Sequence, residues 1–213
     1  DIRLSDLDGN ATVNTGGGTI TVDGVTGNVR ANTGGGDITI DGASGQVEAD
    51  TGGGAITVRG DSSRVIVRTG GGDLRIEGTQ GEIEANTGGG TISIRDSSGT
   101  IRADTGGGDI DVENASGQIT ASTGGGSINY SGRLEDNSEL QTGGGDIVVE
   151  LPADSNLDLD LEVPSSCNDC EIRVAFDVEG NVSQRQVRGT IGSGDGSTLQ
   201  ARTGGGDIVV ESQ

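Results

Sequence analysis

The stretch that decides the fold, residues 33–51, reads TGGGDITIDGASGQVEADT. Its opening Thr-Gly-Gly-Gly recurs at a spacing of 18 residues, and two further copies follow outside that spacing. The copies begin at Thr15, Thr33, Thr51, Thr69, Thr87, Thr105 and Thr123, and then at Thr142 and Thr203. A fixed period of this kind indicates a repeat architecture in which every frame folds into the same unit.

Each frame holds two short runs of alternating apolar and polar residues. In the stretch above, Ile38 and Ile40 alternate with polar residues after the glycines, and Val47 and Ala49 do so after a Gly- and Ser-rich turn. Alternation with period two predicts a strand with one buried and one exposed face. We therefore predict an all-β fold, a single β-solenoid with two short strands per 18-residue coil and a core in which large residues face alanines.

The residues at the turns have predicted roles of their own. Glycine accepts backbone conformations that side chains forbid, so we expect the triplets to form positive-φ turns. The threonine before each triplet points inward, and we expect its hydroxyl to join a hydrogen-bonded ladder along the turn edge.

Composition limits the function. The chain has 34 acidic and 13 basic residues in 213, a net charge of −21, and it contains no histidine, methionine or tryptophan. Nucleic-acid phosphates require a basic face, so we expect no nucleic-acid partner. With few catalytic residue types and only two aromatic residues, we expect a protein that is not an enzyme and has no cofactor. No apolar run approaches the ~18 residues of a membrane-spanning helix.

The regular period extends over residues 1–150, and residues 151–213 differ. No Thr-Gly-Gly-Gly occurs between Thr142 and Thr203, yet Leu157, Leu159 and Leu161 alternate with acidic residues as a half-buried strand would. We predict that residues 151–213 form enlarged coils of the same solenoid and end in a last TGGGD repeat. Asp158 and Asp160 could be the acid pair of a carbohydrate-active enzyme, but such a strand is far more often a solvated face.

Two cysteines, Cys167 and Cys170, stand where other frames carry the glycine triplet, directly before Glu171 and Ile172. A disulfide that closes this turn is the preferred interpretation, and it would imply an oxidising compartment. A zinc half-site would need a second pair of ligands. A redox Cys-x-x-Cys pair would normally have a helix that activates the thiol.

Both ends of the sequence fall within the repeat. The first residues overlay the start of a later frame, and the last ones repeat the run that follows a triplet. Neither end shows the polar cap that solenoids usually need, and open strand edges pair with other chains. We therefore expect copies to stack head to tail through edge residues, namely Asp1, Ile2, Leu4, Asp207, Ile208 and Val210.

Acidic residues and sequons mark further candidate sites. The residue after the triplet is acidic in alternate coils, which makes candidate calcium ligands of Asp37, Asp73, Asp109 and Asp146. The nonapeptide calcium β-roll has its motif on both turns of a coil, whereas this chain has an aspartate on only one.

Four Asn-x-Ser/Thr sequons are candidate glycosylation sites in an exported protein, at Asn10, Asn114, Asn129 and Asn181.

The frame Thr-Gly-Gly-Gly-Asp-Ile-x-Ile/Val, together with the closing residues 187–208, resembles an adhesin family of prokaryotic surface proteins with glycine-rich β-solenoid repeats. The resemblance covers nearly the whole chain and implies an extracellular or surface-attached protein without catalytic residues. We expect a structural, adhesin-like protein whose ends stack into a fibre. The alternatives are a monomeric surface stalk and a calcium-dependent β-roll module.

Overall fold

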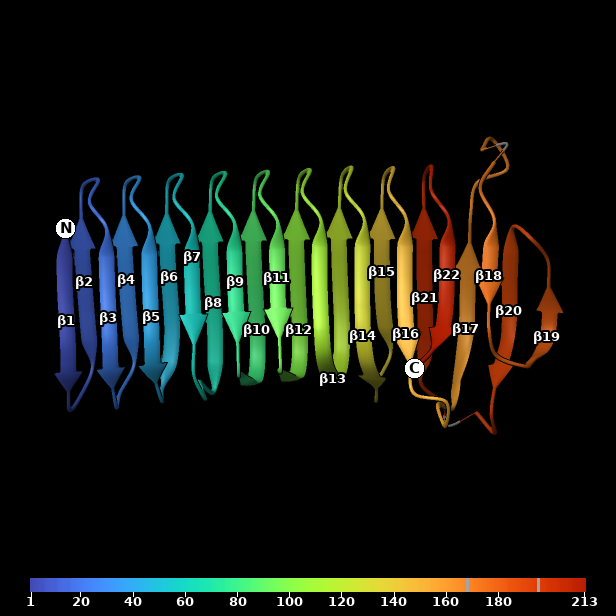
Figure 1. The fold of residues 1–213 in the computed structure, drawn as a ribbon, viewed down its shortest axis with the longest axis horizontal. Coiled ribbons are helices and arrows are strands. Elements are labelled where there is room, and N and C mark those ends of the chain that lie inside the picture. Colours follow the sequence, from blue (N-terminus) through green and yellow to red (C-terminus); the bar gives the residue numbers. More distant parts are fainter. Residues whose placement is uncertain (168, 195) are drawn as a thin grey trace.

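The computed structural model describes residues 1–167, 169–194 and 196–213. Within them the fold is all-β, with parallel strands stacked into a solenoid of about eight regular coils. Figure 1 shows the strands side by side along one axis, with the triplet turns on one long edge and the second turns on the other. The predicted fold class is therefore confirmed.

The strands form two rows, one on each side of the core. The first row contains, in spatial order, β1 (Ile2–Leu7), β3 (Ile20–Val25), β5 (Ile38–Ala43), β7 (Ile56–Arg59), β9 (Leu74–Glu77), β11 (Ile92–Arg95), the start of β13 (Ile110–Thr123), β14 (Ile128–Leu134), β16 (Ile147–Leu151), β22 (Ile208–Ser212) and β18 (Ile172–Val174).

The second row lies opposite. It contains β2 (Ala11–Thr15), β4 (Val29–Thr33), β6 (Gln46–Thr51), β8 (Arg64–Thr69), β10 (Gln80–Thr87), β12 (Ser98–Thr105), the end of β13, β15 (Ser138–Thr142), β21 (Thr198–Thr203), β17 (Leu157–Glu162), β20 (Gln186–Ile191) and β19 (Val178–Val182).

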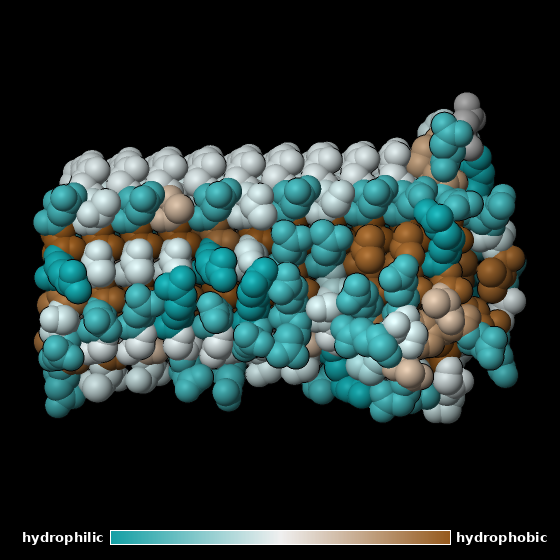
Figure 2. Space-filling model, in the orientation of Figure 1, coloured by the Kyte–Doolittle hydropathy of each residue, from teal (hydrophilic) through white to brown (hydrophobic). Residues whose placement is uncertain are grey.

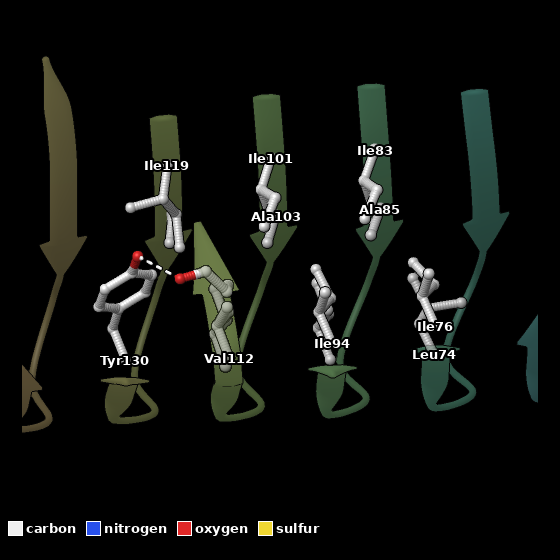
Figure 3. Packing of buried hydrophobic residues seen from close by; sticks show 14 of the residues in the cluster. Leu74, Ile76, Ile83, Ala85, Ile94, Ile101, Ala103, Val112, Ile119 and Tyr130 are labelled. Atoms are coloured by element: carbon white, nitrogen blue, oxygen red, sulfur yellow. Dashed lines mark hydrogen bonds between the residues drawn. The ribbon is translucent and has the colours of Figure 1, made fainter. Parts of the chain in front are cut away.

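Register is constant along the regular coils. Ile38 pairs with Ile20 and Ile56, and Ala49 pairs with Ala31 and Val67. The core is thus built from continuous columns, in which large side chains of the first row meet smaller ones of the second. Figure 3 shows this packing, with Ile76, Ile94 and Val112 facing Ala85 and Ala103 across the narrow interior.

Positive φ occurs at the turn opposite the triplets, contrary to expectation. One position of that turn has a positive φ in successive coils, at Asp6, Gly24, Gly42, Gly60, Gly78, Asp96, Asn114 and Gly132. Glycine, aspartate and asparagine are the residues that tolerate this region best. None of the triplet glycines, all of which are described, has a positive φ. The triplets must therefore be glycine for another reason.

The prediction of enlarged coils holds only in part: β17 and β18 form one longer coil that pairs in parallel with β21 and β22, whereas β19 and β20 do not continue the parallel stack. Residues 152–197 form a cap in which β17 and β20 pair antiparallel, and β19 pairs antiparallel with β20. The last repeat then returns to the regular solenoid, because β21 pairs with β15 and β22 with β16. In Figure 1 these two red strands lie between the yellow-orange and orange ones, out of chain order.

Candidate functional site

The triplet turns form a smooth edge along the rod, the pale row at the top of Figure 2. A Cβ on the first or third glycine would collide with the backbone of the preceding coil; Gly70 lies against Gly52 O, and Gly72 against Gly54 O. A Cβ on the middle glycine, Gly71, would meet nothing within 4 Å. From the second triplet onward, close approach between coils therefore requires the outer two glycines of each triplet.

The inward threonines form the hydroxyl ladder that the sequence predicts. Thr33 Oγ1 donates to Gly18 O of the preceding coil at 2.8 Å and accepts from Gly36 N at 3.4 Å. The same pair of bonds recurs at Thr51, Thr69, Thr87, Thr105, Thr123, Thr142 and Thr203. Each threonine closes its own turn and ties it to the coil before.

The candidate calcium ligands each bind the backbone of the next coil. Asp37 Oδ1 accepts from Ala55 N, Asp73 Oδ1 from Thr91 N and Asp109 Oδ1 from Ser127 N, each at 2.8 Å. Asp146 Oδ1 does the same with Asp207 N at 2.8 Å. Within the described residues no three or more acidic, cysteine or histidine side chains are placed to hold a metal ion. The structure therefore does not bring these aspartates together, and it gives each of them a structural partner.

Ion pairs link neighbouring coils along the outward columns. Arg59 lies between Asp41 and Glu77 at 3.3 and 3.5 Å, and Arg95 pairs with Glu113 at 2.9 Å. Between such columns lie open grooves. One of about 300 Å³ contains the pair of Arg30 and Glu48. These pairs are exposed, so each stabilises the fold by only tenths of a kcal/mol.

Burial shifts the pKa of two aspartates in the second row. Partial burial raises the pKa of Asp50, although Arg68 opposes the shift with its positive charge. Burial also raises the pKa of Asp104, with Arg102 acting in the opposite direction. Neither arrangement places a nucleophile beside a base, so these shifts reflect burial between neighbouring coils.

The cysteine turn lies in the cap. A disulfide joins Cys167 and Cys170, whose Cα atoms are 5.5 Å apart. Arg185 holds the same loop, because its Nη1 donates to Pro164 O at 3.0 Å and to Cys167 O at 2.7 Å. Asn168, between the cysteines, lies outside the described residues. The loop continues into Glu171, whose amide donates to Asp207 Oδ1 at 3.0 Å, as the residue after the triplet does in alternate coils.

A polar cluster around Asp160, whose partners the sequence did not indicate, joins the cap to the last repeat. Asp160 of β17 accepts from Arg188 of β20 at 3.0 Å and from Gln200 of β21 at 3.2 Å, and Arg202 lies 3.4 Å away. Burial alone would raise the pKa of Asp160, but these hydrogen bonds and charges outweigh it and lower that pKa. The alternation of Leu and Asp predicted a solvated face because the partner strands are remote in sequence.

The sequons differ in their surroundings. Asn10 Oδ1 accepts from Asn28 N at 2.8 Å, and the Nδ2 atoms of Asn114 and Asn129 donate to Asp96 and Asp111 at 2.5 and 2.8 Å. Asn181 is exposed on β19, the last strand of the second row. The amide nitrogen that would carry a glycan is therefore already hydrogen-bonded at Asn114 and Asn129.

The predicted assembly edges do not match each other. Asp1, Ile2 and Leu4 belong to β1, or lie next to it, and β1 pairs only with β3 among the described strands. In contrast, β22 pairs with β16 on one side and β18 on the other, which places Asp207, Ile208 and Val210 inside the row. The expectation that these three residues form an open edge is wrong, because the cap covers that end of the solenoid.

Comparisons with known proteins agree with this architecture. In the described residues no helix is both long and apolar enough to cross a membrane. Neither a curated protein nor a solved structure gives a significant match. The family model described as Toastrack DUF4097 matches residues 1–211, nearly the whole chain. The chain therefore belongs to the Toastrack DUF4097 family.

Proposed function

We propose that this protein is a non-catalytic structural protein of the cell exterior, a rigid rod that serves as a stalk or spacer at the cell surface. The observation that carries the proposal is the register of the stack, which is continuous from β1 to β12. Each inner coil is bonded to both neighbours, so bending the rod would break hydrogen bonds and core contacts together.

The size of the rod suits a spacer. Among the described strands the first row takes ten steps from β1 to β18. At ~4.8 Å per step this is about 50 Å. The charged side chains are spread over the face that Figure 2 shows, with the ion pairs described above between neighbouring coils. Such a charged surface supports the role of a spacer that stays soluble.

Two features favour a location outside the cell. The cap carries a disulfide, and disulfides persist in oxidising compartments. The net charge of −21 keeps an elongated particle soluble and separate from its neighbours. An adhesive role would use the sides of the rod, because the cap covers one of its ends.

The same cap bears on how copies assemble. A fibre built by stacking the last repeat on the first would need β22 at an edge, but β22 is internal. The monomeric stalk is therefore the better supported of the two modes. For protein purified in its folded state, without unfolding and refolding, we expect a single species in light scattering as the concentration rises, and no end-to-end filaments by negative-stain electron microscopy.

The decisive experiment for the proposed function tests location and redox state together. Antibody labelling of intact producing cells, followed by thiol alkylation before lysis, should show surface signal and no alkylated cysteine. The chain has no lysine, so amine-reactive surface labels are poor probes here. Labelling that requires lysis, or free thiols in the native protein, would contradict the proposal.

A further inference from the structure

The last repeat is placed out of chain order. Residues 198–212, which we name the intercalated segment, comprise β21 and β22 with their triplet turn. β21 lies between β15 and β17, and β22 lies between β16 and β18. The cap strands therefore come first in sequence. The intercalated segment follows them in sequence but lies between the cap and the regular coils, as the strand order in Figure 1 shows.

The gap has two bonded walls. On the side of the regular coils, Asp207 N donates to Asp146 Oδ1 at 2.8 Å, and Thr203 Oγ1 donates to Gly145 O at 2.8 Å. On the cap side, Arg173 pairs with Asp207 at 2.7 Å. The four inward apolar residues of the segment are fully buried: Leu199, Ala201, Ile208 and Val210. The gap is thus a complete acceptor site for a strand-turn-strand segment, which we name the acceptor slot.

The occupant resembles its neighbour. Residues 142–150 and 203–211 both read TGGGDIVVE, and the two stretches pair residue on residue. Recognition on this side therefore depends on repeat sequence and register. The intercalated segment of any copy of the chain has the required sequence and register, so it fits the acceptor slot equally well.

The connection to the segment is a glycine-rich hinge. Residues 192–197 link β20 to β21, which lie on opposite sides of β17. Gly192 and Gly194 have φ values of 68° and 65°, and Gly196 has a φ of 90°. Two strand spacings, about 9.6 Å, separate the ends that the hinge joins. Glycines of this kind allow the hinge to turn back in one copy or to extend toward another.

We propose that the acceptor slot also takes the intercalated segment of a second copy, so that copies of this chain exchange residues 198–212. Every contact across the two walls is the same in the exchanged and unexchanged forms, and only the hinge differs. Concentration and hinge length therefore set the balance between them. Reciprocal exchange gives a dimer, and onward exchange gives a chain of rods. The inference does not rest on the proposed function.

A cysteine trap tests the exchange in the full-length protein. Val148 and Val209 pair in register on the outward face, at a spacing that suits a disulfide. Chains carrying Val148→Cys are mixed with chains carrying Val209→Cys, unfolded, refolded together without reductant, and run on a non-reducing gel. Neither chain can form the new bond alone. We expect a covalent heterodimer whose yield rises with protein concentration.

The control replaces Val148→Cys with Thr21→Cys, an outward residue of the same row far along the rod. Exchange cannot bring position 21 to position 209, so this mixture reports random cross-linking. A heterodimer yield equal to that of the control overturns the proposal.

Changing the hinge length tests the same mechanism independently. Deleting residues 192–197 joins Ile191 directly to Thr198 through one Cα step of about 3.8 Å, which cannot span the two strand spacings between β20 and β21. We expect light scattering to show a doubled mass or a larger one, whereas inserting four Gly/Ser residues keeps the monomer. A deletion variant that is folded and monomeric overturns the proposal. If the deletion prevents folding, the cysteine trap decides.

Discussion

At the scale of single residues, the three glycines of each triplet meet different surroundings. From the second triplet onward, the outer two lie against the backbone of the preceding coil, where a Cβ has no room. A Cβ on the middle one would meet no atom closer than 3.5 Å, and this glycine has no positive φ. Steric contact thus explains two glycines of three, and nothing in the structure explains the middle one.

This difference predicts opposite results for neighbouring substitutions. Gly72→Ala should destabilise the protein by roughly 1–3 kcal/mol or more, because the methyl group overlaps Gly54 O in a stack that cannot shift locally. Gly71→Ala should leave stability unchanged or raise it by about 0.4–1 kcal/mol, because alanine restricts the unfolded chain. Urea unfolding of both variants checks the prediction, and equal losses would show that the middle glycine has a structural role.

Two aspartates, Asp160 and Asp50, should change the stability of the fold with pH in opposite directions. The pKa of Asp160 is lowered in the fold, so its stabilising effect is complete above the unfolded value of 3.8 and is lost as the pH falls through the folded value. The pKa of Asp50 is raised, so its charged form costs stability at neutral pH, and the cost is relieved as the pH falls through that raised value. At pH 7, Asp160→Asn should therefore destabilise and Asp50→Asn should stabilise, and both effects should shrink at pH 3. Urea midpoints at the two pH values test this, and shifts of the same sign at pH 7 would contradict it.

At the scale of elements, the regular strands could be predicted and the cap could not. The alternation around Ile38 and Val47 fixes which face is buried, and the constant 18-residue period lets successive coils stack in register. The cap depends on antiparallel pairing between β17 and β20, whose partners are up to 34 residues apart, as with Leu157 and Ile191. No local pattern encodes that pairing.

The position of the intercalated segment was hidden for a related reason. Residues 203–211 repeat residues 142–150, so the sequence indicates a coil there but not which neighbours it has. The cluster around Asp160 was missed with it, because Gln200 and Arg202 come from that segment. The repeated sequence does not indicate the order in which these strands lie in space.

The disulfide should stabilise the cap and leave the regular coils little changed. Replacing both cysteines, Cys167→Ser with Cys170→Ser, removes a short covalent loop worth about 2 kcal/mol. Hydrogen exchange should rise near Glu171 and Ile172, while the amides of β5 to β10 keep their protection. Wild-type protein under reductant should match the double variant, and the variant itself should not respond to reductant. Uniform loss of protection along the rod would contradict this local role.

At the scale of the whole molecule, nearest-neighbour stacking determines how the rod tolerates changes in length. A coil contacts the coils before and after it, so stability is close to a sum over coils and their interfaces. Any frame can then follow any other, provided that the columns stay in register. Two coils form the natural unit of removal, because the aspartate after the triplet occurs in alternate coils, as at Asp37, Asp73 and Asp109.

We therefore expect a chain lacking residues 73–108 to fold into a shorter rod. The deletion joins Gly72 to Asp109, so Ile110 stacks on Ile56, and Glu113 takes the place of Glu77 beside Arg59. The maximum dimension from small-angle scattering should fall by about 10 Å, two strand spacings, with the circular dichroism per residue unchanged. Deleting residues 73–99 instead removes one and a half coils and places second-row residues in the first row. That control should unfold or aggregate, because Thr105 would fall at the position of Gly78, where φ is 82°, and its triplet would lie on the wrong edge of the rod. If both deletions fold equally well, stacking in register is not what holds the rod together.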